Sequence, residues 1–149
     1  MSFKQELHEK CRQLLAERIE RAQQLIEQAQ EAAELESKSS AGDKYETGRA
    51  MMLIERENAE GQLQEALKLK KVMDQIHPNR KTSIAELGSL LQTSAGYYYL
   101  SISMGKILIG DKEAFVLSPV SPLGQFLVGK KAGDSFSFNS RPLNILAVE

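Results

Sequence analysis

The sequence predicts an α+β protein in which a long antiparallel helical hairpin, a coiled coil, precedes a small, mostly antiparallel β domain with one short helix. Residues 3–37 contain neither Gly nor Pro and are rich in strong helix formers. All four prolines and seven of the ten glycines lie after residue 77. The net charge changes at the same point, from −3 over residues 1–77 to +2 over residues 78–149. We therefore expect two domains, residues 1–77 and 78–149.

The first helix carries the spacing of a coiled-coil seam, with apolar residues alternately four and three positions apart. The seam residues are Leu15, Ile19, Ala22, Ile26, Ala29 and Ala33. Ser, Gly and Asp residues between Ser37 and Asp43 favour a turn. A second helix is expected from about Lys44 to Ile76, and His77-Pro78 ends it. Its inward positions are Met52, Ala59, Leu63, Ala66 and Met73. About 35 residues per helix correspond to roughly 50 Å.

Short apolar and β-branched runs separated by glycines predict the strands of the second domain. These runs are residues 87–91, 97–102, 106–109, 114–117, 135–138 and 143–148. One short helix is expected from Ser121 to Val128, with Ser121 as its cap and Pro122 as its first residue. Residues 129–134 have the composition of a turn.

Two carboxylates, Asp43 and Glu46, lie three residues apart where the second helix should begin. In one interpretation Asp43 caps that helix and Glu46 completes a capping box. In the other, both carboxylates hold a divalent metal inside a partner, since oxygen ligands suit Mg²⁺ and one protein often supplies only one or two of them. The spacing alone fits both interpretations.

The composition excludes several classes of protein. Cys11 is the single cysteine, so neither an intrachain disulfide nor a cysteine-based metal cluster can form. The apolar face of the first helix places Cys11 in a core, whereas His8 and His77 are expected at the surface or at a boundary. No apolar run approaches the roughly 18 residues of a membrane span. We expect a cytoplasmic protein without a membrane partner.

Two motifs resemble the Gre family of bacterial transcript cleavage factors (GreA/GreB). The tip reads Gly42-Asp43-x-x-Glu46, similar to the family's Gly-Asp-x-x-Glu. The second domain reads Leu117-Ser118-Pro119-Val120-Ser121-Pro122-Leu123-Gly124, then Gly129-Lys130-Lys131-x-Gly133-Asp134. The resemblance covers nearly the whole chain and implies that the C-terminal domain has an FKBP-like fold.

The resemblance also implies a function. A factor of this family would bind RNA polymerase during transcription elongation, as a monomer, and insert its coiled coil into the secondary channel. Asp43 and Glu46 would hold a Mg²⁺ ion shared with the polymerase active site, and the polymerase itself would cleave backtracked RNA. The factor would contact nascent RNA only indirectly and work on a DNA-bound enzyme. Docking is expected through a set of C-terminal residues: Ser121, Pro122, Leu123, Gly124, Lys130 and Lys131.

One segment departs from the family pattern. The family usually continues Asn-Ala-Glu-Tyr after the tip glutamate, whereas this chain has Thr47-Gly48-Arg49-Ala50. Two alternatives to a cleavage factor stay open. The chain can be a secondary-channel regulator or inhibitor of polymerase that does not stimulate cleavage. It can also be a coiled-coil adaptor whose tip carboxylates only cap a helix.

Overall fold

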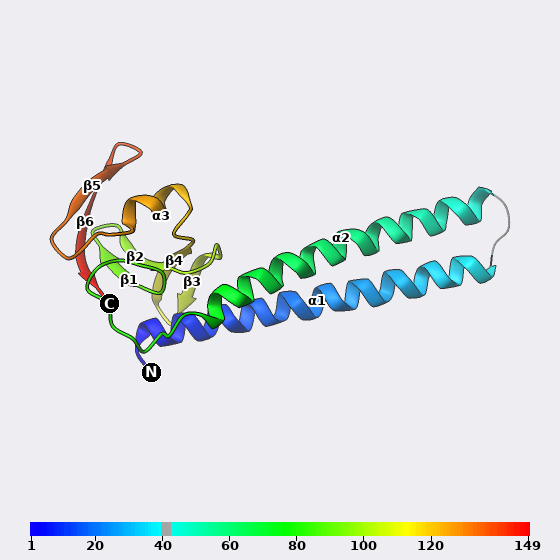
Figure 1. The fold of residues 1–149 in the computed structure, drawn as a ribbon, viewed down its shortest axis with the longest axis horizontal. Coiled ribbons are helices and arrows are strands. Elements are labelled where there is room, and N and C mark those ends of the chain that lie inside the picture. Colours follow the sequence, from blue (N-terminus) through cyan, green and yellow to red (C-terminus); the bar gives the residue numbers. More distant parts are fainter. Residues whose placement is uncertain (40–42) are drawn as a thin grey trace. The chain divides into compact units, whose positions relative to one another are not determined.

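The computed structural model describes residues 1–39 and 43–149 (Figure 1). Side chains are described outside residues 36–46. The chain divides into two compact units. One unit comprises Gln13–Lys70, and the other combines Met1–Arg12 with Lys71–Glu149. The change in composition at residue 77 suggested the domain boundary, whereas the contacts group the start of the first helix with the C-terminal segment.

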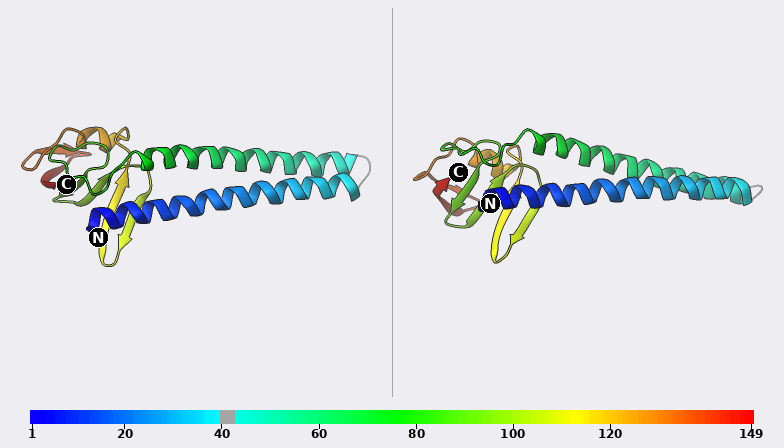
Figure 2. Two further views of the ribbon diagram at one scale, coloured as in Figure 1. Left: turned by 60° about the horizontal axis from the view of Figure 1, so that its bottom comes forward. Right: turned by 90° about the horizontal axis from the view of Figure 1, so that it is seen from below.

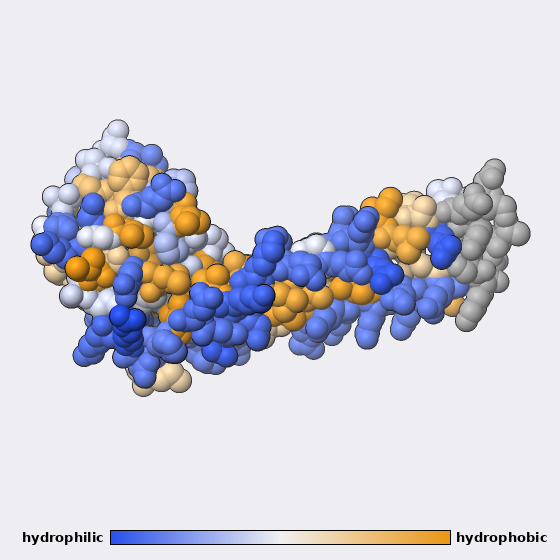
Figure 3. Space-filling view, viewed as in Figure 1, coloured by the Kyte–Doolittle hydropathy of each residue, from blue (hydrophilic) through white to orange (hydrophobic). Residues whose placement is uncertain are grey.

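The unit of residues 13–70 is a hairpin of two helices, α1 (Phe3–Ser39) and α2 (Asp43–Asp74). The small seam residues are almost inaccessible: Ala22, Ala29, Ala33, Ala59 and Ala66 are each at most 6% exposed. Their short side chains allow the two backbones to approach closely. On the face shown in Figure 3, hydrophobic residues form a stripe between the polar flanks of this hairpin. The predicted coiled-coil seam is confirmed.

The helix ends differ slightly from the sequence prediction. Helix α1 continues to Ser39, two residues past the start of the expected turn at Ser37. Helix α2 begins at Asp43 and ends at Asp74, before the expected Ile76. Within the part of the chain that the structure describes, neither helix is apolar over enough of its length to cross a membrane.

The C-terminal segment forms a six-stranded sheet of order β3-β4-β2-β1-β6-β5 with one short helix (Figures 1 and 2). The elements are β1 (Leu90–Thr93), β2 (Gly96–Leu100), β3 (Gly105–Ile109), β4 (Lys112–Leu117), α3 (Pro122–Leu127), β5 (Ser135–Phe138) and β6 (Arg141–Val148). Every pairing is antiparallel except that of β2 with β4. The predicted α+β class, a helical hairpin followed by a mostly antiparallel sheet with one short helix, is confirmed.

The first predicted strand starts later than expected, at Leu90 instead of Leu87. Gly88 adopts a φ of 93°, which is open to glycine but costly for other residues. A Cβ atom at this position would also lie 3.0 Å from a methyl carbon of Ile76. The chain therefore turns at Gly88 before it joins the sheet.

The two faces of the sheet are covered differently. On one face lies the start of α1, where Phe3 meets the ring of Tyr97 edge-on at 5.0 Å and His8 Nδ1 lies 2.8 Å from the Tyr99 hydroxyl. On the other face, Leu127 of α3 joins a buried cluster with Leu91 and other strand residues. The first turns of α1 thus belong to the core of the C-terminal unit.

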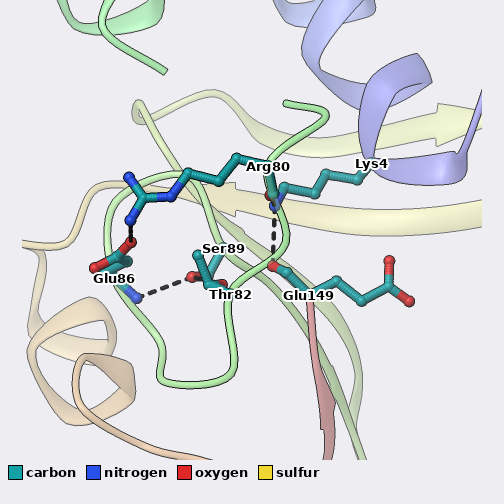
Figure 4. A network of polar contacts seen from close by, with 6 residues as sticks. All are labelled: Lys4, Arg80, Thr82, Glu86, Ser89 and Glu149. Carbon is teal, nitrogen blue, oxygen red and sulfur yellow. Dashed lines mark hydrogen bonds and ion pairs between the residues drawn. The ribbon is translucent and has the colours of Figure 1, made fainter. Parts of the chain in front are cut away.

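Lys4 ties three distant segments of this unit together (Figure 4). Its side chain is buried, and Nζ donates to the carbonyl oxygens of Arg80 at 2.8 Å and Glu149 at 3.0 Å. Nearby, the hydroxyls of Thr82 and Ser89 share a 2.6 Å hydrogen bond. Burial lowers the pKa of Lys4, which the surrounding carboxylates oppose. The segment after α2 is therefore held against both α1 and the end of β6.

Replacing Lys4 with Met is expected to lower the free energy of unfolding by about 1–2 kcal/mol, because two carbonyl groups lose a charged donor while the desolvation cost of the lysine is also removed. Urea denaturation measures this. Lys68→Met is the control, since the ion pair of Lys68 with Glu65 is solvent-exposed and should contribute under about 0.5 kcal/mol. If Lys4→Met were as stable as the unmodified protein, the desolvation penalty of the buried ammonium would equal the stabilisation from its two hydrogen bonds.

Candidate functional site

The tip carboxylates lie at the start of α2. Asp43 is the first residue of this helix and Glu46 falls in its first turn, but their side chains lie outside the described residues. Directly after them, Thr47, Arg49 and Ala50 are exposed. Elsewhere in the described part of the chain, no three His, Cys, Asp or Glu residues come together as metal ligands.

The loop before α3 is shaped by local hydrogen bonds of Ser121. Its Oγ accepts from the backbone N–H of Gly124 at 3.2 Å and donates to the Ser118 carbonyl oxygen at 2.6 Å. Pro122 occupies the start of the helix, as the sequence predicts. Gly124 is buried, and a Cβ atom there would overlap the Ser118 carbonyl oxygen. Glycine is thus required for the loop to fold back on the helix.

The turn after α3 is fixed mainly by its backbone. Ala85 N–H donates to the Lys130 carbonyl oxygen and Gly129 N–H donates to the Ala85 carbonyl oxygen, each at 2.8 Å. The backbone N–H of Lys131 donates to Asp134 Oδ2 at 3.0 Å. The Lys130 ammonium lies 5.6 Å from the centre of the Phe136 ring, a cation–π distance. The two lysines are therefore carried on a fixed turn next to α3.

The loop and α3 leave apolar groups in solvent. Val120 is 78% exposed, and Pro122 and Phe126 are also exposed. Phe126 stacks on Phe136 with ring centres 5.8 Å apart. Leu123, by contrast, is half-buried against the core. Of the predicted docking residues, the structure brings Ser121, Pro122, Leu123 and Gly124 together, and only Pro122 among these four is exposed.

His8 lies at the boundary between α1 and the sheet, one of the two positions expected for it, and it is buried there against Tyr99. It is 3% exposed, and its Nε2 atom is buried without a hydrogen-bond partner among the described residues. Burial lowers the pKa of the imidazole below its usual 6.5, and the neighbouring charge of Arg12 lowers it further. Cys11, one turn further along α1, is fully buried as expected, and burial raises its pKa to about 11.

The stability of the protein is expected to fall as the pH decreases below about 6.5. Above that pH, His8 is neutral in both the folded and the unfolded chain. Below it, the unfolded chain binds the proton more readily, so up to about 1 kcal/mol is lost over the next pH unit. Urea denaturation at pH 7.5 and 5.5 measures the difference. His8→Gln should reduce it, whereas mutation of the exposed His77 to Gln should preserve it. If the stability difference between pH 7.5 and 5.5 were unchanged in His8→Gln, groups other than His8 would cause the pH effect.

A groove that no sequence pattern predicts lies on the α3 side of the sheet and has a volume of about 810 Å³. Its lining includes Tyr98, Phe115, Leu123, Phe138 and Pro142. The Tyr97-Tyr98-Tyr99 run indicates one of these residues. Side chains alternate between the two faces of a strand, so Tyr98 must lie on the opposite face from Tyr97 and Tyr99. The other four residues come from later elements, and no local pattern joins them.

No family model matches the chain, and no curated protein matches it. Among solved structures, the chain is similar to one described as the structure of the transcription factor Gfh1, with 18% sequence identity. The similarity covers 91% of each chain, with a TM-score of 0.35.

Proposed function

We propose that this protein is a bacterial transcription elongation factor that binds RNA polymerase and stimulates cleavage of backtracked RNA by the polymerase. The hairpin would enter the secondary channel with Asp43 and Glu46 leading. Polymerase, and not this chain, would be the enzyme. The proposal rests on the Gre-like motifs at the tip and around α3.

The observation that carries the proposal is the position of the acidic pair. It lies in the first turn of α2, directly after the segment that joins helices of 37 and 32 residues. Helices of that length measure roughly 50 Å, enough to bring a tip to a site well below a partner's surface. Two carboxylates three residues apart on a helix lie on one face, and their oxygens suit Mg²⁺. A second metal ion stabilises the attacking and leaving oxygens of a phosphoryl displacement.

A cleavage assay tests the proposal. RNA polymerase is stalled and backtracked on a template with 3′-labelled RNA, and release of the short 3′ fragment is followed with and without the protein. Stimulated release supports the proposal. Binding to polymerase without stimulation supports the alternative of a non-catalytic secondary-channel regulator. Absence of binding overturns both and leaves the coiled-coil adaptor.

The regulator alternative has a specific basis in the chain. Arg49 is exposed three residues after Glu46, where the family pattern has an acidic residue. A cation there would oppose a nearby Mg²⁺ ion. Arg49→Glu should therefore increase cleavage if the carboxylates bind the metal.

The surface formed by Val120, Pro122 and the Lys130-Lys131 turn is proposed as the polymerase-docking surface. Val120→Asp is expected to weaken binding to polymerase about tenfold, because a charge would be forced into an apolar contact. Fluorescence anisotropy with labelled protein measures this. The melting temperature should stay constant, since Val120 is 78% exposed. Leu108→Asp, at a 62% exposed position on β3, is the control and should bind normally. Equal affinities for the two variants would remove the loop from the docking surface.

A further inference from the structure

The groove on the α3 side of the sheet has a feature that the proposed function does not use. Tyr98 of β2 pairs directly with Phe115 of β4, and their rings meet edge-on with centres 6.2 Å apart. Phe115 is 39% exposed even though it sits on an inner strand. Helix α3 has only six residues, so it covers the cluster around Leu127 and leaves this aromatic part of the sheet open.

The groove has the size and chemistry of a binding site. Its volume of about 810 Å³ lies within the range of roughly 300–1,000 Å³ found for ligand sites. Phe138 at the end of β5, Asn139 in the β5–β6 turn and Pro142 on β6 also line the groove. Asn139 and Ser140 both have positive φ values, as a two-residue hairpin turn requires. Because α3 and this tight turn fix the lining residues, the groove does not depend on a loop closing.

The charges that line the groove specify a single negative group. Lys106, Glu113 and Arg141 all belong to the lining. Lys106 and Glu113 lie on paired strands, with Nζ and Oε1 3.9 Å apart, and so partly neutralise each other. Arg141 remains as the excess cation. One exposed guanidinium suits one carboxylate and can bind it with two parallel hydrogen bonds. The additional negative charges of a triphosphate or of several phosphate groups would instead be repelled by the Glu113 carboxylate.

We propose that this groove binds an extended segment of a protein partner that carries an aromatic side chain next to a carboxylate. The aromatic side chain would pack on Tyr98 and Phe115, edge-on or offset, as such rings prefer. The carboxylate would pair with Arg141. The lining is drawn from five strands and from α3, which gives room for several extended residues. This interaction is separate from the proposed polymerase-docking surface, because Val120, Pro122, Lys130 and Lys131 do not line the groove.

The test uses the full-length protein labelled with ¹⁵N and three blocked tetrapeptides, followed by amide chemical shifts. Acetyl-Gly-Phe-Asp-Gly-amide should shift amides of β2, β4 and the β5–β6 turn in a saturable way. Acetyl-Gly-Ala-Asp-Gly-amide and acetyl-Gly-Phe-Lys-Gly-amide should bind at least about fivefold more weakly. Phe115→Ala should weaken binding of the Phe-Asp peptide about tenfold. Leu146→Ala, at a 56% exposed position outside the groove, is the matched control and should not change it.

A charge exchange makes the test specific. Arg141→Glu should weaken binding of the Phe-Asp peptide and strengthen binding of the Phe-Lys peptide. A general loss of structure could not produce this reversal. Amide shifts of the free variant, unchanged away from residue 141, verify that it folds. The proposal is overturned if no peptide gives saturable shifts, or if Phe115→Ala and Leu146→Ala behave alike. It is also overturned if uridine 5′-monophosphate binds this groove more tightly than the Phe-Asp peptide, which would make it a nucleotide site.

Discussion

Replacement of Asp43 by Asn together with Glu46 by Gln is expected to reduce stimulation of RNA cleavage at least tenfold while leaving polymerase affinity within about twofold. The amides keep the size of the carboxylates and much of their hydrogen-bonding capacity, but they remove the negative charge that Mg²⁺ requires. The rate of 3′-fragment release from a backtracked complex measures the effect. Glu55→Gln, which removes an exposed carboxylate further along α2, is the matched control and should cleave normally.

The same substitutions separate the two interpretations of the tip. Asn caps a helix as well as Asp does, so the capping interpretation expects Asp43→Asn to be silent in both stability and activity. The metal interpretation expects the loss to be partly relieved at higher Mg²⁺ concentration, because mass action offsets weaker ligands. If the double variant stimulates cleavage at the normal rate, the tip carboxylates are not metal ligands. If the unmodified protein binds polymerase and never stimulates cleavage, the segment Thr47-Gly48-Arg49-Ala50 becomes the first target for substitution.

Gly124→Ala is expected to lower the free energy of unfolding by about 3 kcal/mol, the largest stability effect of a single methyl group that we foresee. The added Cβ atom would overlap the Ser118 carbonyl oxygen, a backbone atom that also accepts hydrogen bonds from Ser121 N–H and Oγ. Either α3 or the loop must move. Ser121→Ala, which removes the cap and keeps the space, should cost about 1 kcal/mol. Thermal and urea denaturation measure both.

Gly61 provides the control for this glycine substitution. It lies within α2, and a Cβ atom there would have nothing within 4 Å. Gly61→Ala should therefore stabilise the protein by up to about 1 kcal/mol through helix propensity alone. A Gly124→Ala protein that melts within 2 °C of the unmodified one would show that the Ser118–Gly124 loop adjusts freely, and docking through a fixed loop would lose its basis.

The features predicted correctly from the sequence are those set by neighbouring residues. The Ser121 cap and Pro122 act over three or four positions, and the seam of α1 repeats every seven, so both are visible in a short window of sequence. The hairpin and the α+β class follow from such local signals. The tip pair Asp43 and Glu46 was also visible, but its role depends on a partner and stays a prediction.

The features missed depend on residues that are far apart in the chain. Lys4 bonds to a carbonyl group 145 residues away, and His8 lies against Tyr99, so nothing local marks either side chain as buried. An amphipathic helix pattern shows which face is apolar but not whether a helix or a sheet covers it. The parallel pairing of β2 with β4 was hidden for the same reason, since alternation gives the face of a strand and not its neighbour.

The grouping of Met1–Arg12 with Lys71–Glu149 has a consequence for synthesis on the ribosome. Helices α1 and α2 can pair along Gln13–Lys70 as soon as the second of them has emerged, because both halves of this unit have then been made. The apolar positions Phe3, Leu7 and Cys11 must wait until the strands have been made, the last of which ends at Val148. The nascent chain therefore exposes the start of its first helix for most of translation. This short segment is where a chaperone would be expected to bind the unfinished protein.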